Sequence, residues 1–235
     1  PALANYNYEI IIFDNNSNEG TKEYLKNFQE NKRFKIVFNK ENVGINGKSL
    51  AAEECKGEYL IGIDDDVIEF PSDWLEKMLY AYNNIPSISY LATDVVQDET
   101  TTGAKFPPEK YRSEFFAGGK IELQVGPTGG WCYMLSRKIY TDVGKLLRMP
   151  GRIFFSEDGD YINRCIHKNY RYGILAGVKV YHATGEYHNK EFKKVYDEKM
   201  EDYKTKDTLF EFKNKLRYIF SLKKYLAKIQ DYSQR

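Results

Sequence analysis

The sequence is poor in several features that would assign it quickly to a class of protein. Only three of its 235 residues are cysteines, and they are far apart, without a metal-binding spacing: Cys55, Cys132 and Cys165. An odd number of dispersed cysteines argues against a disulfide scaffold and favours a reducing, cytosolic compartment. No run of about 18 apolar residues is present, so no membrane-spanning helix is predicted. No signal peptide is visible either.

The chain also lacks an excess of charge of one sign. Its 35 basic and 34 acidic residues give a formal net charge of +1, so there is no overall case for nucleic-acid binding. Aromatic residues are abundant instead, with 20 Tyr and 14 Phe. They fit two interpretations, as core filler or as stacking platforms for bases or sugars. The length predicts one domain, with or without an appendage.

Short apolar runs alternate with helical patterns through the first 92 residues. Strands are expected near residues 8–13, 34–38, 59–63 and 88–92, with helices between them. This alternation predicts an α/β fold with a doubly wound, mostly parallel sheet and helices on both faces. Residues 94–120 then form a long polar excursion. Beyond them the patterns predict strands at 121–125, 131–135, 172–175 and 178–181, and helices at 137–147 and 161–167.

One strand ends in three consecutive carboxylates. The apolar run from Tyr59 to Ile63 stops at Asp64, Asp65 and Asp66. Ligands bind at the carboxyl ends of strands in open α/β sheets. Alternation along an extended chain points Asp64 and Asp66 the same way. A hard divalent cation that also holds a substrate diphosphate would suit them, although an acidic turn that caps the next helix is the alternative.

Five segments, in this order, resemble family 2 glycosyltransferases with the GT-A fold. They are Asp14–Thr21, Asn42–Gly44, Gly57–Asp66, Gly129–Arg137, and Glu157–Tyr161 with Arg164. The resemblance covers about residues 8–185. It implies a Rossmann-like, mostly parallel sheet, and it places the first strand of the family before residue 1, so the natural N-terminus is expected to be missing here.

The resemblance assigns the carboxylates to a metal and to the sugar nucleotide. Asp66 is the expected direct ligand of Mn²⁺ or Mg²⁺, Asp64 supports it, and His182 matches a position where some members place a third ligand. Asp65 is expected to face the ribose or the donor sugar. A lone histidine is otherwise more often a packing residue.

Three further residues are expected to hold the nucleotide, with UDP or dTDP as the favoured carrier. Asp14 and Asn15 follow the first visible strand, where the pyrimidine ring is bound in the family. Lys48 matches a basic position that contacts the base or the diphosphate, and its alternative is a solvated helix residue.

The second half is expected to hold the acceptor and the catalytic base. Asp158 is the predicted general base of an inverting, single-displacement transfer, although all the acids near it could instead cap a helix. Glu157 is expected near the acceptor. Trp131 and Tyr133 share one face of an extended segment, where they could stack on a sugar or simply pack in the core.

The sequence divides into a catalytic domain and a tail. Residues 1–188 are the expected GT-A domain, with a nucleotide-sugar half at 1–92 and an acceptor half at 93–188. Residues 189–235 form a lysine-rich tail with an apolar stripe at helical spacing, mainly within 209–230. A C-terminal helical extension is therefore predicted. It would pack on the domain or on a sister subunit, or lie on an anionic membrane surface.

The leading hypothesis is an inverting, metal-dependent glycosyltransferase that uses a UDP- or dTDP-sugar. Its acceptor would be a hydroxyl of a saccharide or a lipid-linked glycan, in bacterial surface polysaccharide synthesis such as that of lipopolysaccharide, at the inner face of the cell membrane. The alternatives are a non-catalytic nucleotide-sugar-binding or scaffold domain, a nucleotidyltransferase, and a phosphatase of the haloacid dehalogenase type.

Overall fold

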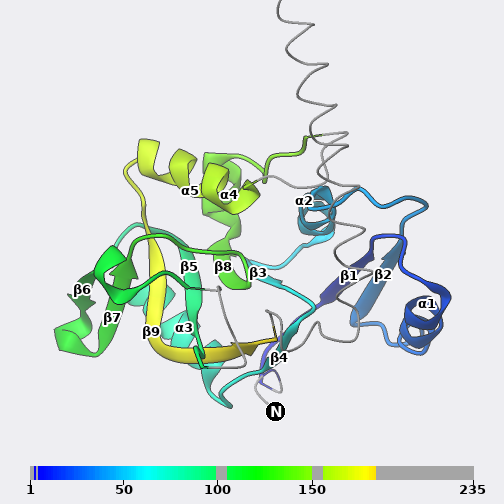
Figure 1. Ribbon diagram of the computed structural model, residues 1–235, viewed down its shortest axis with the longest axis horizontal. Coiled ribbons are helices and arrows are strands. Elements are labelled where there is room, and N and C mark those ends of the chain that lie inside the picture. Colours follow the sequence, from blue (N-terminus) through cyan, green and yellow to red (C-terminus); the bar gives the residue numbers. More distant parts are fainter. Residues whose placement is uncertain (1–2, 4, 99–104, 150–155, 184–235) are drawn as a thin grey trace, which may run out of the picture.

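The computed structural model describes residues 3, 5–98, 105–149 and 156–183 (Figure 1). The predicted C-terminal helical tail, 189–235, lies outside these residues. The elements follow one another as β1 (Ile10–Asp14), α1 (Glu19–Lys26), β2 (Phe34–Phe38), α2 (Asn46–Glu54), β3 (Tyr59–Ile63), β4 (Val67–Glu69), α3 (Trp74–Asn84), β5 (Ile88–Val95), η1 (Pro108–Lys110), β6 (Arg112–Phe116), η2 (Ala117–Gly119), β7 (Ile121–Val125), β8 (Cys132–Ser136), α4 (Arg137–Val143), α5 (Glu157–His167) and β9 (Arg171–His182).

The described strands form two sheets. β1 and β2 pair in parallel, and the larger sheet has the order β3-β8-β5-β9-β7-β6, with β4 paired to β9. The α/β fold predicted from the sequence is confirmed. Strands β3, β5, β6 and β9 run in one direction, but β8 and β7 are inserted between them in the opposite direction. Most neighbours in the larger sheet are therefore antiparallel, and β5–β9 is its parallel pair.

Strand β5 lies at the centre of the larger sheet, and every one of its residues is buried. Burial on both faces requires cover on both sides, because side chains alternate along a strand. Helices α3 and α5 both contact β5 and β9, and they lie on opposite sides of the sheet (Figure 1). The predicted division at residues 92 and 93 falls inside β5, so both halves of the chain share this sheet.

Local sequence explains where the helices begin and which face they bury. Asn18 and Ser136 cap α1 and α4, because their side-chain oxygens accept hydrogen bonds from the backbone N–H groups of Thr21 and Ile139. Helix α3 buries an apolar stripe at helical spacing, made by Trp74, Leu75, Met78, Ala81 and Tyr82. That stripe joins the main core around β5.

Five expectations need correction, and four of them concern the second half of the domain. The polar excursion contains a strand, β6, and the strand β4 was not expected. Helix α4 ends at Val143, before Gly144 at φ 97°, rather than at residue 147. Helix α5 begins at Glu157, so its acids lie inside the first turn. The two short strands expected at 172–175 and 178–181 are one bulged strand, β9, with Gly177 at φ 81°.

Candidate functional site

The acidic end of β3 lies beside the end of β9. Strand β4 pairs with β9 so that Val67 is opposite His182, and Ala183 N–H donates to the Asp66 carbonyl over 2.8 Å. Asp64 N–H donates to the Trp131 carbonyl over 2.9 Å. These backbone bonds bring potential ligand atoms of Asp64, Asp66 and His182 within 4.8 Å of one another. The sequence expected this grouping, but the strand that produces it was missed.

The donor set of this group fits a divalent cation. Two carboxylates and one imidazole suit Mn²⁺ or a similar ion, and a neighbouring carboxylate commonly orients a ligating histidine. His182 Nε2 lies 2.8 Å from Asp66 Oδ1, while Nδ1 is buried and has no hydrogen-bond partner among the described residues. The hydrogen bond to His182 lowers the pKa of Asp66, despite the partial burial of that carboxylate. Asp66 is therefore kept ionised, as a metal ligand must be.

Lys48 of α2 links this group to α5. Its Nζ lies 2.7 Å from Asp64 Oδ1, 3.4 Å from Glu157 Oε1 and 3.5 Å from the Gly130 carbonyl oxygen. Burial works against its charge, but the two carboxylates outweigh that effect and raise the pKa of Lys48. Burial raises the pKa of both Asp64 and Glu157, although Lys48 opposes the rise. The sequence predicted Lys48 as a site residue but not these two partners.

Asp158 lies in the first turn of α5, and one of its oxygens is fixed by that turn. Its Oδ1 accepts hydrogen bonds from Ser156 Oγ over 3.2 Å and from Gly159 N over 2.7 Å. Its Oδ2 faces Gly130, where a built Cβ would lie 3.6 Å from it and 3.1 Å from Lys48 Nζ. The missing side chain of Gly130 therefore leaves room between the predicted base and the metal-binding group.

The two residues expected at the pyrimidine ring differ in their surroundings. Asp14 is buried, its Oδ1 accepts from Ser17 N–H over 3.2 Å, and its Oδ2 has no partner among the described residues. Asn15 braces the turn at 42–44, because its amide accepts from Val43 N–H and donates to the Gly44 carbonyl. These bonds give Asn15 a structural role. Recognition of the pyrimidine ring by Asp14 or Asn15 stays a prediction.

Two residues expected to stack on a sugar lie in the core. Trp131 is 4% exposed and donates from Nε1 to the Thr93 carbonyl over 3.0 Å. Tyr133 is 6% exposed and stacks on Tyr90 with 4.7 Å between ring centroids. Both rings therefore pack in the core, which was the alternative interpretation, because neither ring presents a face to solvent. Asp65, by contrast, is exposed, and its expected role at the ribose or the donor sugar stays a prediction.

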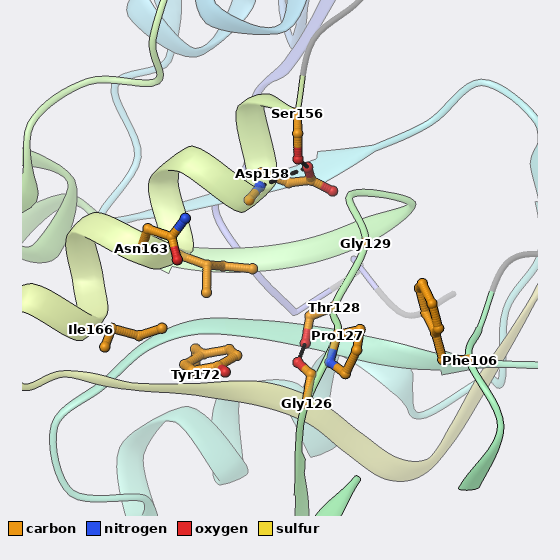
Figure 2. A pocket seen from close by; sticks show the side chains of 12 residues that line it. Phe106, Gly126, Pro127, Thr128, Gly129, Ser156, Asp158, Asn163, Ile166 and Tyr172 are labelled. Carbon is orange, nitrogen blue, oxygen red and sulfur yellow. Dashed lines mark hydrogen bonds between the residues drawn. The ribbon is translucent and has the colours of Figure 1, made fainter. Parts of the chain in front are cut away.

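A pocket of about 570 Å³ opens beside Asp158 (Figure 2). Its walls come from Ser156 and helix α5, the loop 126–129, β9 and the segment that carries Phe106. In Figure 2, Asn163 and Ile166 of α5 approach from one side and Phe106 from the other. Sequence reasoning did not name Phe106 or Tyr172 as pocket residues.

These features define an α/β protein with an acidic, histidine-containing centre at the ends of its strands. Residues 2–144 match the model of the family described as Glycosyl transferase family 2. The match covers more than half of the chain, so the chain belongs to glycosyl transferase family 2, as its motifs predicted.

Two curated relatives carry similar names. An uncharacterized glycosyltransferase of Methanocaldococcus jannaschii, MJ1057, is 29% identical over 175 residues, which are 71% of this chain and 56% of that protein. The uncharacterized glycosyltransferase YfnE of Bacillus subtilis is 35% identical over 80 residues, which are 33% of this chain and 20% of that protein. The matches thus span between a fifth and a little over half of these relatives.

Three solved structures share the fold at low sequence identity. A Pyrobaculum calidifontis mannosyltransferase, PcManGT, in complex with GDP-Man and Mn²⁺, has a TM-score of 0.53 and 14% identity over 76% of this chain and 48% of its own. GalNAc-T7 with UDP, GalNAc and Mn²⁺ has a TM-score of 0.55 and 18% identity, covering 74% and 37%. S. aureus TarS has a TM-score of 0.54 and 13% identity, covering 80% and 56%. These likenesses confirm the predicted GT-A class of fold.

Within the described ranges, no helix combines the length and the apolar character needed to cross a bilayer.

Proposed function

We propose that this protein is an inverting, metal-dependent glycosyltransferase that moves a sugar from a UDP- or dTDP-sugar to a hydroxyl group of a glycan or lipid-linked acceptor. The observation that carries the proposal is the grouping of Asp64, Asp66 and His182 within 4.8 Å, with Lys48 and Asp158 adjoining across Gly130. Membership of the family and the Mn²⁺ in two solved structures of the same fold support it.

Asp64, Asp66 and His182 are the residues that would hold Mn²⁺ or Mg²⁺. When bound, the cation neutralises negative charge that develops on the departing nucleoside diphosphate. Lys48 contributes a second positive charge at the same edge of the sheet, because it already lies against Asp64. Asp14, whose buried Oδ2 has no partner among the described residues, can accept the N3–H of a pyrimidine ring.

Asp158 supplies the base in this proposal. The acceptor oxygen attacks the anomeric carbon, the bond from that carbon to the diphosphate oxygen breaks, and the nucleotide leaves with the electron pair. The acceptor proton passes to Asp158 Oδ2, since Oδ1 is held by Ser156 and Gly159. A single displacement of this kind inverts the configuration of the transferred sugar.

A thermal-shift screen tests the donor site. UDP-, dTDP- and GDP-sugars are added with and without Mn²⁺ to the wild type, to Asp66→Ala and to the control Asp73→Ala, which removes an exposed carboxylate paired with Lys77. A ligand that binds the native state raises the melting temperature. Metal-dependent stabilisation by one nucleotide class that is lost only in Asp66→Ala is the expected result. Equal stabilisation of all three proteins contradicts the metal site.

We propose further that the product is a bacterial surface polysaccharide, such as the lipopolysaccharide O-chain, made in the cytoplasm at the membrane surface. The sequence of the tail, lysine-rich with an apolar stripe within 209–230, supports this location or a homodimer contact. Flotation with anionic and neutral vesicles separates the two possibilities. Membrane binding by the lysine-rich tail predicts flotation with the anionic vesicles, whereas a homodimer contact predicts flotation with neither kind.

A further inference from the structure

Phe106 is a large apolar side chain that remains 57% exposed at the edge of the pocket beside Asp158. It lies across the pocket from α5 (Figure 2). An exposed aromatic ring that lines a pocket offers a flat face to a ligand, whereas scattered exposed aromatics such as Phe115 line none of the described pockets.

The residue before Phe106 anchors this segment to the sheet. Lys105 Nζ lies 2.6 Å from Asp94 Oδ1 of β5 and 2.7 Å from Gln124 Oε1 of β7. The side chains of Lys105 and Asp94 are 12% and 7% exposed, so the ion pair is largely shielded from water. Breaking a buried pair is costly because it leaves one charge uncompensated. The Lys105 side chain therefore holds this segment against the sheet.

A tyrosine ties Phe106 to the loop 126–129. The backbone N–H of Phe106 donates to Tyr111 Oη over 3.3 Å, and the same hydroxyl donates to the Pro127 carbonyl over 2.8 Å. Lys105 Nζ also lies 5.2 Å from the centre of the Tyr111 ring. Phe106 and Pro127, which both line the pocket, are thus held at a fixed separation by one side chain.

The lining of the pocket is chemically mixed. Apolar groups come from Pro127, Ile162, Ile166 and Tyr172, and hydrogen-bonding groups from Thr128, Ser156 and Asn163. Among the described residues that line it, Asp158 carries the charge. A sugar ring has an apolar C–H face and a hydroxyl edge, which match this mixture. A carboxylate or phosphate on that sugar would be repelled by Asp158.

We propose that Phe106 selects the acceptor by stacking on an uncharged sugar ring whose hydroxyl faces Asp158, and that Lys105 and Asp94 are positioning residues for Phe106. The inference rests on the proposed function, and it assigns the acceptor to this pocket rather than to Trp131 and Tyr133.

Saturation-transfer NMR with methyl glycosides tests the stacking. The panel contains neutral methyl hexosides and a methyl uronide, and the proteins are the wild type, Phe106→Ala and the control Phe115→Ala. We expect a neutral glycoside to bind the wild type and Phe115→Ala alike, and to bind Phe106→Ala roughly three- to tenfold more weakly. No signal from any neutral glycoside with the wild type, unchanged affinity in Phe106→Ala, or preference for the uronide overturns the proposal.

A double-mutant cycle tests the positioning role. Lys105→Met is expected to weaken binding of the same glycoside about as much as Phe106→Ala does, and to add little in the Phe106→Ala background. Lys105→Arg, which keeps the charge, should restore most of the affinity. Additive losses in the double variant, or full affinity in a folded Lys105→Met, contradict the positioning role.

The donor screen distinguishes this proposal from the proposed function. Metal-dependent donor stabilisation together with an unchanged glycoside affinity in Phe106→Ala rejects the pocket assignment alone. A glycoside signal that depends on Phe106, in a protein that no nucleotide sugar stabilises, rejects the donor assignment and retains the saccharide pocket.

Discussion

At the scale of single residues, Lys48 is the cation that balances the acidic site. It lies between carboxylates from two elements, Asp64 at the end of β3 and Glu157 in α5. The alternative assignment of Lys48 as a solvated helix residue is inconsistent with these two contacts. A sequence pattern can place a lysine on α2, but the partners are distant in the chain and depend on how the helices dock.

Replacing Lys48 by Met is expected to strengthen the binding of Mn²⁺ alone, because it removes a positive charge from the side of a metal ligand. The gain should be on the order of tenfold, as for a partly screened charge interaction. Isothermal titration with MnCl₂ measures it. Lys22→Met, which removes an exposed lysine bonded to Asn16, is the control and should leave the affinity unchanged.

Replacing His182 by Ala is expected to have the opposite effect. Loss of an outer-shell partner commonly costs about 10–100-fold in metal affinity, and loss of a direct ligand should cost at least as much. The same titration measures the change. His167→Ala, at the end of α5 and outside the metal-binding group, serves as the control. Equal Mn²⁺ affinity in both variants would remove His182 from the site.

At the scale of elements, apolar runs predicted several of the strands. The runs at 34–38, 59–63 and 88–92 correspond to β2, β3 and β5, because most residues in these segments are apolar or aromatic. Strand β6 was missed because Arg112, Ser113 and Phe115 are exposed on it and give no such signal. Strand β4 has only three residues and forms through its pairing with β9.

The candidate site could also be predicted only in part, because only some of its residues lie in local sequence patterns. Asp64 and Asp66 share a local motif that spacing alone reveals, and the resemblance supplied His182 and Asp158. The ring of Phe106 and its anchors Lys105 and Asp94 carry no local pattern, since an ion pair between separate segments is decided by tertiary packing. The placement of Trp131 and Tyr133 was ambiguous, because the sequence of an alternating strand does not reveal which of its faces is covered.

The close packing of β3 against β8 gives a prediction about stability. A Cβ added at Gly62 would lie 2.4 Å from the ring of Tyr133, and that ring is buried against Tyr90. Gly62→Ala should therefore lower the free energy of unfolding by about 1–3 kcal/mol through overpacking. Urea denaturation measures it. The control Gly20→Ala, in helix α1 with ordinary contacts, should be neutral or stabilising by up to about 1 kcal/mol.

At the scale of the whole molecule, a small polar contact joins the two halves of the chain. Asn46 accepts from Met149 N–H over 2.7 Å and donates to the Val43 carbonyl over 2.8 Å. Ser49 Oγ lies 3.0 Å from the Leu146 carbonyl oxygen. Asn46 and Ser49 are both buried, so helix α2 is fixed to a segment about a hundred residues later by bonds that water cannot easily replace.

Asn46→Ala is expected to lower the free energy of unfolding by roughly 1–3 kcal/mol, because it leaves the partly buried Met149 N–H and Val43 carbonyl without the bonds that Asn46 makes. Denaturation monitored by circular dichroism measures the change. Asn84→Ala, which removes an exposed side chain bonded to the Tyr80 carbonyl, is the matched control and should change little. A loss in Asn46→Ala no larger than that in Asn84→Ala would show that the halves are held by other contacts.

Strand β9 has a consequence for how relatives of this protein can diverge. It contributes Tyr172 to the pocket near one end and His182 to the metal-binding group at the other. A single inserted or deleted residue between them would move all later side chains to the opposite face of the strand. Tyr172 and His182 could then no longer occupy the pocket and the metal-binding group at the same time. Changes of length are therefore expected to accumulate at the β6–β7 connection, where a Cβ added at Gly118 or Gly119 would have no atom within 4 Å, and to be selected against within residues 172–182.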